Sequence, residues 1–164
     1  MEVINVLLVD DDPNRTAPFR RILLREGFQK TIGGTKVNVI EALDAEDAMT
    51  QLQTTKFQLV VTDLRMPHTI GHKVAIAASK DPNCVVILNS DIGKDGAEIK
   101  KFIGSESENI PSTVQIKAKQ EVTLDFIQEL IKRLVSATRQ TLEANLQRSS
   151  PEDFNFRLPS PPKS

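Results

Sequence analysis

The stretch that decides the fold is Val3-Ile4-Asn5-Val6-Leu7-Leu8-Val9, which is followed directly by Asp10-Asp11-Asp12. An almost continuously apolar, β-branched run of this kind is typical of a strand buried on both faces of a parallel sheet. Three similar runs follow, over residues 37–42, 57–62 and 85–88, and a weaker fifth covers residues 113–116. We therefore expect five short strands.

Apolar residues at helical spacing fill the gaps between these runs. The segments with this spacing cover residues 14–25, 45–53, 71–79, 95–103 and about 121–147. Strand alternating with helix five times over predicts an α/β fold, with a parallel sheet that carries helices on both faces. The stretch 29–36 is longer than a usual connection, so we expect a mobile turn or a hairpin there.

Composition limits the classes of function. The chain has 164 residues, with 21 Lys and Arg against 22 Asp and Glu, and one cysteine, Cys84. A net charge of −1 gives no basic face for duplex nucleic acid. A lone cysteine excludes an internal disulfide and a cysteine-based zinc site. The N-terminus lacks the basic region of a signal peptide, and no apolar run approaches the roughly 18 residues of a membrane span, so we expect a soluble cytoplasmic protein.

Polar residues follow four of the expected strands. Asp10-Asp11-Asp12 ends the first, Asp63 the third, Asn89-Ser90 the fourth and Lys117 the fifth. In an open parallel sheet the carboxyl ends of the strands meet at one edge, where ligands bind. Grouped carboxylates repel one another unless a cation lies among them, and Mg²⁺ prefers such oxygen ligands. A metal ion, a lysine and a free carboxylate together predict a phosphoryl-transfer site, with the carboxylate as the nucleophile.

Each of these acidic residues taken alone has a simpler explanation. Asp, Asn and Ser after a strand are common N-caps of the following helix. Their joint occurrence at several strand ends, with Lys117 at another, is what favours a shared site over a set of unrelated caps.

Three motifs stand in a fixed order along the chain: Val6-Leu7-Leu8-Val9-Asp10-Asp11-Asp12-Pro13, Val60-Val61-Thr62-Asp63-Leu64-Arg65-Met66-Pro67-His68-Thr69-Ile70-Gly71, and Ile116-Lys117. In residue types, order and spacing they resemble the receiver domain of two-component response regulators, of the stand-alone chemotaxis type. The resemblance covers about residues 4–137. It implies a flavodoxin-like doubly wound sheet with the strand order 2-1-3-4-5, which agrees with the pattern of strands and helices.

The resemblance also implies a role for each matching residue. Asp63 would accept the phosphoryl group, Asp11 would bind Mg²⁺ directly, and Asp10 would assist through water. The main-chain carbonyl of Arg65 would complete the protein ligands, and Lys117 would pair with the phosphoryl oxygens. The chain would then be a signalling phosphoacceptor rather than an enzyme. Its implied partners are a histidine kinase or phosphotransfer protein and a downstream protein, without direct contact to nucleic acid and without a membrane span.

Three positions depart from the family pattern. The Ser or Thr that the family has at the end of the fourth strand is here either Ser90 or Asn89, and Ser90 is favoured because it offers a hydroxyl. Val114 replaces the aromatic residue common on the fifth strand, and Ala118 replaces the proline after the lysine. These departures leave open a degenerate receiver, which would bind partners without being phosphorylated.

A further alternative is a phosphohydrolase of the haloacid dehalogenase type. Asp10 would then be the nucleophile and Asp12 the acid/base, with Ser90 and Lys117 in support. That family requires a later acidic pair for the metal, and the acidic residues closest after Lys117 lie on an expected helix. In a receiver, Asp12 is instead expected to cap the first helix.

The chain divides into three expected segments: a receiver domain over residues 1–137, a helical extension over 138–147, and a Pro/Ser-rich tail over 148–164. An apolar stripe on the extension, which includes Leu142 and Leu146, favours either an exposed helix end or a homodimer. The composition of the tail predicts a disordered end or a short docking peptide.

Overall fold

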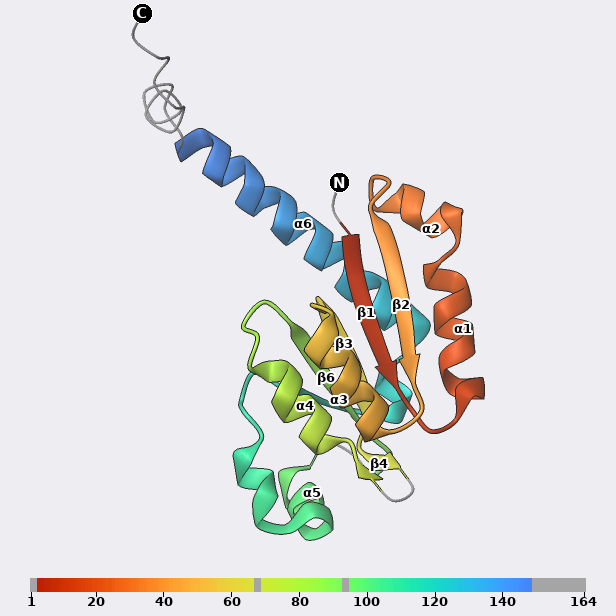
Figure 1. Ribbon diagram of the computed structural model, residues 1–164, viewed down its shortest axis with the longest axis vertical. Coiled ribbons are helices and arrows are strands. Elements are labelled where there is room, and N and C mark those ends of the chain that lie inside the picture. The colour runs from red at the N-terminus through yellow and green to blue at the C-terminus, as the bar shows by residue number, and fades with distance from the viewer. Residues whose placement is uncertain (1–2, 67–68, 93–94, 149–164) are drawn as a thin grey trace, which may run out of the picture.

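A five-stranded parallel sheet forms the centre of the molecule in a computed structural model, which describes residues 3–66, 69–92 and 95–148 (Figure 1). The strands are β1 (Val3–Val9), β2 (Lys36–Ala42), β3 (Leu59–Asp63), β6 (Val85–Ser90) and β7 (Gln115–Ala118), in the order β2-β1-β3-β6-β7. A short antiparallel hairpin of β4 (Arg65–Met66) and β5 (Thr69–Ile70) lies outside this sheet. Without the hairpin strands the order is 2-1-3-4-5, which confirms the expected doubly wound fold.

Helices cover both faces of the sheet, as the alternating pattern predicts (Figure 1). One face carries α1 (Pro13–Leu23), α2 (Glu26–Thr31) and α6 (Leu124–Arg148). The other face carries α3 (Ala45–Thr54), α4 (His72–Ser79) and α5 (Gly96–Ile103). Two 3₁₀ segments, η1 (Gly104–Asn109) and η2 (Lys119–Glu121), lie on either side of β7 in the chain.

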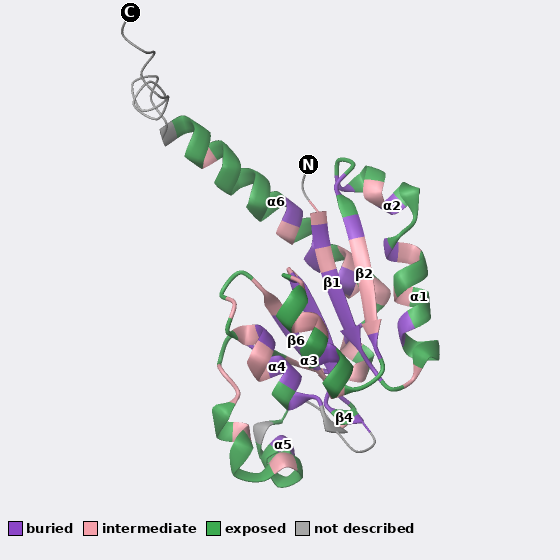
Figure 2. Ribbon diagram, in the orientation of Figure 1, coloured by how far each residue is buried: buried purple, intermediate pink, exposed green. Residues whose placement is uncertain are grey.

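The core has two halves, one on each side of the sheet. Alternate residues of β1 point to opposite faces, so Val6 and Leu8 pack under α6 while Leu7 and Val9 pack under α3 and α4. Figure 2 shows the buried residues concentrated in the strands and on the inner sides of the helices. This arrangement explains why the strands read as continuous apolar runs, since both of their faces are covered.

The segment expected as a turn or hairpin over residues 29–36 is helical in its first part, because α2 extends to Thr31. Phe28 and Ile32 are buried against the α6 side of the core. Gly33 and Gly34 then turn the chain into β2, with φ angles of 69° and 78° that favour glycine. The guanidinium of Arg139 in α6 donates to the carbonyl of Ile32 at 3.0 Å, which ties the turn to the long helix.

The fifth strand of the sheet begins two residues later than expected. Residues 113–116 are the expected strand, but β7 covers Gln115–Ala118. The N–H of Val114 donates to the carbonyl of Pro111 at 3.0 Å, so Val114 still belongs to the preceding turn. The shift moves the carboxyl end of β7 from residue 116 to Ala118, which changes the residues that reach the edge of the sheet.

The helix α6 extends beyond the sheet (Figure 1). Its last buried residue is Val135, and from residue 136 to residue 147 every position except the half-buried Ala144 is exposed. In the part of the chain that the structure describes, no helix is both long and apolar enough to cross a membrane. The expected tail lies, from residue 149 onward, outside the described residues.

Gly71 packs closely against the backbone at the end of β3, and a substitution at Gly71 tests this packing. A Cβ atom at Gly71 would overlap the carbonyl oxygen of Asp63 and lie 2.8 Å from Thr62 Oγ1. We expect Gly71→Ala to lower the free energy of unfolding by about 3 kcal/mol, because backbone must move. Gly27→Ala is the control, since nothing lies within 4 Å of a Cβ there. Urea unfolding followed by circular dichroism should show a lower midpoint for Gly71→Ala only, and equal midpoints would contradict the packing described.

Candidate functional site

Three carboxylates meet at the carboxyl edge of the sheet. Asp10 and Asp11 follow β1 and Asp63 ends β3, and their ligand oxygens can all lie within 4.8 Å of one another. Asp10 and Asp63 are buried, at 7% and 2% exposure, whereas Asp11 is exposed. The structure thus brings together the three aspartates that the sequence analysis assigned to the metal and the phosphoryl group.

Backbone hydrogen bonds hold Asp10 in place. Its N–H donates to the carbonyl of Ala42 at 3.1 Å, which continues the pairing of β1 with β2. Its Oδ1 accepts from the N–H of Asp12 at 2.9 Å. The carboxylate of Asp12 accepts from the N–H of Asn14 at 2.9 Å, so Asp12 is the N-cap of α1, as expected.

Asp63 is the most strongly perturbed carboxylate of the cluster. Burial raises its pKa from 3.8 to about 6, Lys119 opposes this shift, and the charge of Asp10 adds to it. Both of its carboxylate oxygens are buried and lack a hydrogen-bond partner. Burial also raises the pKa of Asp10, against the hydrogen bond from Asp12 and the charge of Arg15. A buried carboxylate with open acceptor sites is a group that would gain from a cation or a new bond.

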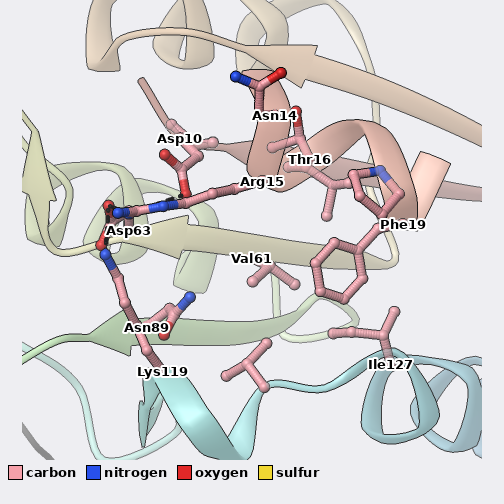
Figure 3. A pocket seen from close by; sticks show the side chains of 14 residues that line it. Asp10, Asn14, Arg15, Thr16, Phe19, Val61, Asp63, Asn89, Lys119 and Ile127 are labelled. Atoms are coloured by element: carbon pink, nitrogen blue, oxygen red, sulfur yellow. Dashed lines mark ion pairs between the residues drawn. The ribbon is translucent and has the colours of Figure 1, made fainter. Parts of the chain in front are cut away.

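Two cations face Asp63 (Figure 3). The ammonium of Lys119 lies 3.5 Å from Asp63 Oδ2. Nη1 of Arg15, from the first turn of α1, lies 3.6 Å from the same oxygen and 3.9 Å from Asp10 Oδ2. Neither residue was among the expected site residues.

The lysine at the cluster is Lys119 and not Lys117, which corrects the expectation from the sequence. Lys117 lies within β7, and its ammonium is 5.8 Å from the centre of the Phe126 ring. Lys117 stands in register with Asn89, but its ammonium lies over Phe126, whereas Lys119 directly follows β7 and its ammonium reaches Asp63. The turn of η2 is closed by the carboxylate of Glu121, which accepts from the N–H of Ala118 at 3.1 Å.

The residue beside Asp63 on β6 is Asn89 rather than Ser90. Asn89 stands in register with Asp63, lines the same cavity, and has a buried Oδ1 that lacks a hydrogen-bond partner. Ser90 is fully buried, and its hydroxyl oxygen accepts from the N–H of Ile92 at 3.2 Å. Because side chains alternate along a strand, Ser90 faces the opposite side of the sheet from Asn89. The expectation that Ser90 occupies the position beside the phosphoacceptor is therefore wrong, because the side chain that lines the cavity is that of Asn89.

The side chain of Arg65 points to neighbouring residues of the β6–α5 region. Its Nε lies 3.5 Å from Asp91 Oδ2, and its guanidinium is 5.7 Å from the centre of the Phe102 ring. Asp91 follows β6 and Phe102 belongs to α5, so Arg65 links the hairpin after Asp63 to this part of the molecule.

A cavity of about 370 Å³ opens between α1, the sheet and the start of α6. Its inner wall is apolar, with Phe19, Val61 and Ile127, and its polar side holds Asp63 and Lys119 (Figure 3). The phosphoacceptor candidate is therefore reached from the side of the sheet that α1 and α6 cover.

The donor set fits Mg²⁺. Carboxylate oxygens are the hard ligands that this ion prefers, and one or two of them usually suffice beside water. Asp63 supplies buried oxygens without partners, and Asp11 supplies an exposed carboxylate through which a hydrated ion could enter. The fit rests on these side chains, and the carbonyl of Arg65 stays an expectation.

Comparisons with known proteins identify the family. The model of the response regulator receiver domain matches residues 6–103, which is more than half of the chain, so the chain belongs to this family. The family is a signalling domain of two-component systems and not a classical enzyme. The match includes all three aspartates of the cluster and ends before β7, so Lys119 lies outside it.

Solved structures share the fold at low sequence identity. The receiver domain of the Francisella response regulator 1452 is 18% identical, with 82% of this chain and 98% of that chain covered and a TM-score of 0.59. A CheY-like response regulator receiver domain protein from Methanospirillum hungatei is 16% identical, with 85% and 99% covered and a TM-score of 0.57. The BeF3-activated DrrB receiver domain is 20% identical, with 83% and 99% covered and a TM-score of 0.53. None of the curated proteins matches the chain.

The raised pKa of Asp63 predicts how the stability of the metal-free protein depends on pH. The native state binds this proton more tightly than the unfolded chain does, because the pKa is about 6 instead of 3.8. The resulting stabilisation is complete below about pH 4 and is lost as the pH rises through about 6. We therefore expect Asp63→Asn to raise the free energy of unfolding at pH 7 by roughly 1–3 kcal/mol in a buffer with chelator.

Urea unfolding at several pH values between 4 and 7 measures this effect. The advantage of Asp63→Asn over the wild type should shrink as the pH falls toward about 4, because the native carboxyl, with its pKa of about 6, is then protonated and carries no buried charge. A difference that stays constant over this range would contradict the assignment of the cost to the ionised Asp63.

Proposed function

We propose that this receiver accepts a phosphoryl group on Asp63 with the help of Mg²⁺ and signals through contacts with other proteins. The observation that carries the proposal is the Asp63 carboxylate, which lies between Asp10, Asp11 and Lys119. Its two oxygens are buried and lack hydrogen-bond partners. The donor would be the phosphohistidine of a histidine kinase or phosphotransfer protein, or a small phosphodonor.

In the proposed reaction an oxygen of Asp63 attacks the phosphorus atom of the donor, and the bond from phosphorus to the donor breaks. The Asp63 carboxylate must be ionised for this step, which its pKa of about 6 permits at neutral pH. Asp10, Asp11, Asp63 and the carbonyl of Arg65 would hold Mg²⁺. The bound ion would neutralise charge on the phosphoryl oxygens. Lys119 takes the role first assigned to Lys117, because its ammonium already lies 3.5 Å from Asp63.

Asn89 takes the position of the hydroxyl residue in this proposal. Its side-chain amide carries two N–H donors, and either could bond a phosphoryl oxygen on Asp63. The degenerate receiver remains the alternative, since Asn89, Val114 and Ala118 all depart from the family pattern. The phosphohydrolase alternative loses support because the chain belongs to the receiver family and Asp12 serves as a helix cap.

A phosphorylation assay with a matched pair of lysine variants tests the proposal. With a small phosphodonor and Mg²⁺, we expect an acid-labile adduct on the wild type and none on Asp63→Asn. Lys119→Ala should slow its formation about 100-fold, because a charged group next to the reacting oxygens is lost. Lys117→Ala is the control and should stay close to the wild-type rate.

Mass spectrometry of the intact protein over time follows the adduct. A loss of rate in Lys117→Ala with Lys119→Ala unaffected would contradict the assignment of the lysine. If the wild type forms no adduct with any donor, the phosphorylation-independent binding module becomes the better account.

We also propose that α6 mediates a homodimer. Leu142 and Leu146 are 49% and 66% exposed, and they lie one turn apart on the part of α6 that extends beyond the sheet. Apolar side chains at this spacing can pair with the same stripe of a second helix.

Sedimentation equilibrium tests the homodimer with two double variants of equal charge. Leu142→Glu with Leu146→Glu should convert the dimer to a monomer, because carboxylates replace the apolar contact. Gln140→Glu with Gln147→Glu adds the same charge on the opposite side of the helix and should leave the mass unchanged. A monomeric wild type would end the proposal.

A further inference from the structure

We propose that Arg15 is the resident counter-ion of the acidic cluster, and that its guanidinium must leave the space between Asp10 and Asp63 before Mg²⁺ binds. The inference rests on the proposed function, since it concerns the same metal site. It assigns to α1 a residue that sets the affinity of the site for its metal ion.

The guanidinium of Arg15 contacts the same carboxylates that would hold the ion. Nη1 lies 3.6 Å from Asp63 Oδ2 and 3.9 Å from Asp10 Oδ2, so one nitrogen bridges the two buried aspartates. Nε lies 3.7 Å from Asp12 Oδ2, which anchors the side chain to the cap of its own helix. Figure 3 shows the side chain extending from α1 across to Asp63.

These contacts are electrostatic and can be exchanged. All three distances are longer than the 2.7–3.2 Å of a usual N–H···O hydrogen bond. Arg15 therefore forms ion pairs with these carboxylates, and the Asp63 oxygens still lack a hydrogen-bond partner. The Arg15 side chain is 51% exposed, so it has room to move into solvent. The backbone of Arg15, by contrast, is fixed in the first turn of α1, next to the cap.

Competition for the same oxygens favours an exchange over joint occupancy. Nη1 of Arg15 contacts Asp10 and Asp63, and Mg²⁺ would take carboxylate oxygens of the same two residues. Two cations that share the same oxygens repel each other. Arg15 can give up these two contacts and keep Asp12, whose Oδ2 lies 3.7 Å from its Nε, so its charge stays paired after the exchange. Mg²⁺ and Lys119 would then balance the formal charges of Asp10, Asp11 and Asp63.

The protein thereby has a metal-free state in which the buried Asp63 is partly neutralised, at the expense of affinity for Mg²⁺. Removing the charge of Arg15 should strengthen Mg²⁺ binding, because the ion no longer displaces a competitor. We expect an effect of about tenfold or more, given how strongly charges at such separations interact.

Titration of the full chain with MgCl₂, followed by NMR or calorimetry, measures the affinity directly. Arg15→Met keeps the length of the side chain and removes the charge, and it should bind Mg²⁺ at least tenfold more tightly than the wild type. Arg21→Met is the matched control, because Arg21 lies exposed on the same helix, and its affinity should not change. Arg15→Lys retains a cation, and its affinity for Mg²⁺ should lie between those of the wild type and Arg15→Met.

The outcomes separate this inference from the proposed function. Equal affinity in Arg15→Met and the wild type overturns the role of Arg15 while the metal site stands. If neither protein binds Mg²⁺, both the inference and the proposed metal site fall. Binding by Arg15→Met alone supports both of them.

Thermal unfolding gives a second readout that does not depend on phosphorylation. In a buffer with chelator, Arg15→Met should unfold at a lower temperature than the wild type, because the carboxylates lose a counter-ion. Addition of Mg²⁺ should then raise the unfolding temperature of Arg15→Met by more than that of the wild type. If the unfolding temperatures of Arg15→Met and the wild type differ by the same amount with chelator and with Mg²⁺, the inference is overturned.

Discussion

Burial of the Asp63 carboxylate is the constraint on which the rest of the site depends. Asp63 ends the central strand β3, with β1 on one side and β6 on the other, and its side chain is 1% exposed. Removing a carboxylate from water costs several kcal/mol unless nearby charges and hydrogen bonds offset the loss. Lys119 and Arg15 supply opposite charge, and the raised pKa shows that the offset is incomplete. The protein therefore tolerates the buried carboxylate of Asp63, and the oxygens of this carboxylate remain open to a cation or a phosphoryl group.

The surrounding backbone fixes the position of Asp63 and leaves its electrostatics adjustable. The N–H of Leu64 donates to the carbonyl of Asn89 at 2.8 Å, and the N–H of Gly71 donates to the carbonyl of Leu64 at 3.0 Å. The close approach of Gly71 to Asp63 leaves no space for a side chain. The counter-ions, in contrast, are the ends of long, partly exposed side chains. A rigid acceptor with exchangeable counter-ions suits a site whose charge must change.

The sequence predicted that the aspartates meet at one edge of the sheet, because they follow buried apolar runs directly, and such runs fix both the strand and its end. The lysine was harder, because β7 is short and weakly apolar, two lysines lie close to its end, and only their side-chain contacts separate Lys117 from Lys119. The choice of Ser90 over Asn89 followed hydroxyl chemistry, whereas the pairing of Asn89 with Asp63 decides which side chain faces the cavity. Arg15 could have been suspected from its place one helical turn after the aspartates. Its contact with Asp63 depends on the path of α1, which no local pattern encodes.

Asn89 and Val114 together restrict how a phosphoryl group on Asp63 could change the fold. A modification shifts a conformational equilibrium only through interactions that differ between the two states. Val114 is buried in the core and has no polar group, so it cannot follow a new charge. Asn89 can, because its Oδ1 is buried without a hydrogen-bond partner, and rotation of the amide could aim its N–H groups at phosphoryl oxygens. Asp91 lies two residues further and pairs with Arg65, which also contacts Phe102 of α5. A rotation of Asn89 would therefore act first on the segment between β6 and α5, the part of the molecule that Arg65 connects to the hairpin after Asp63.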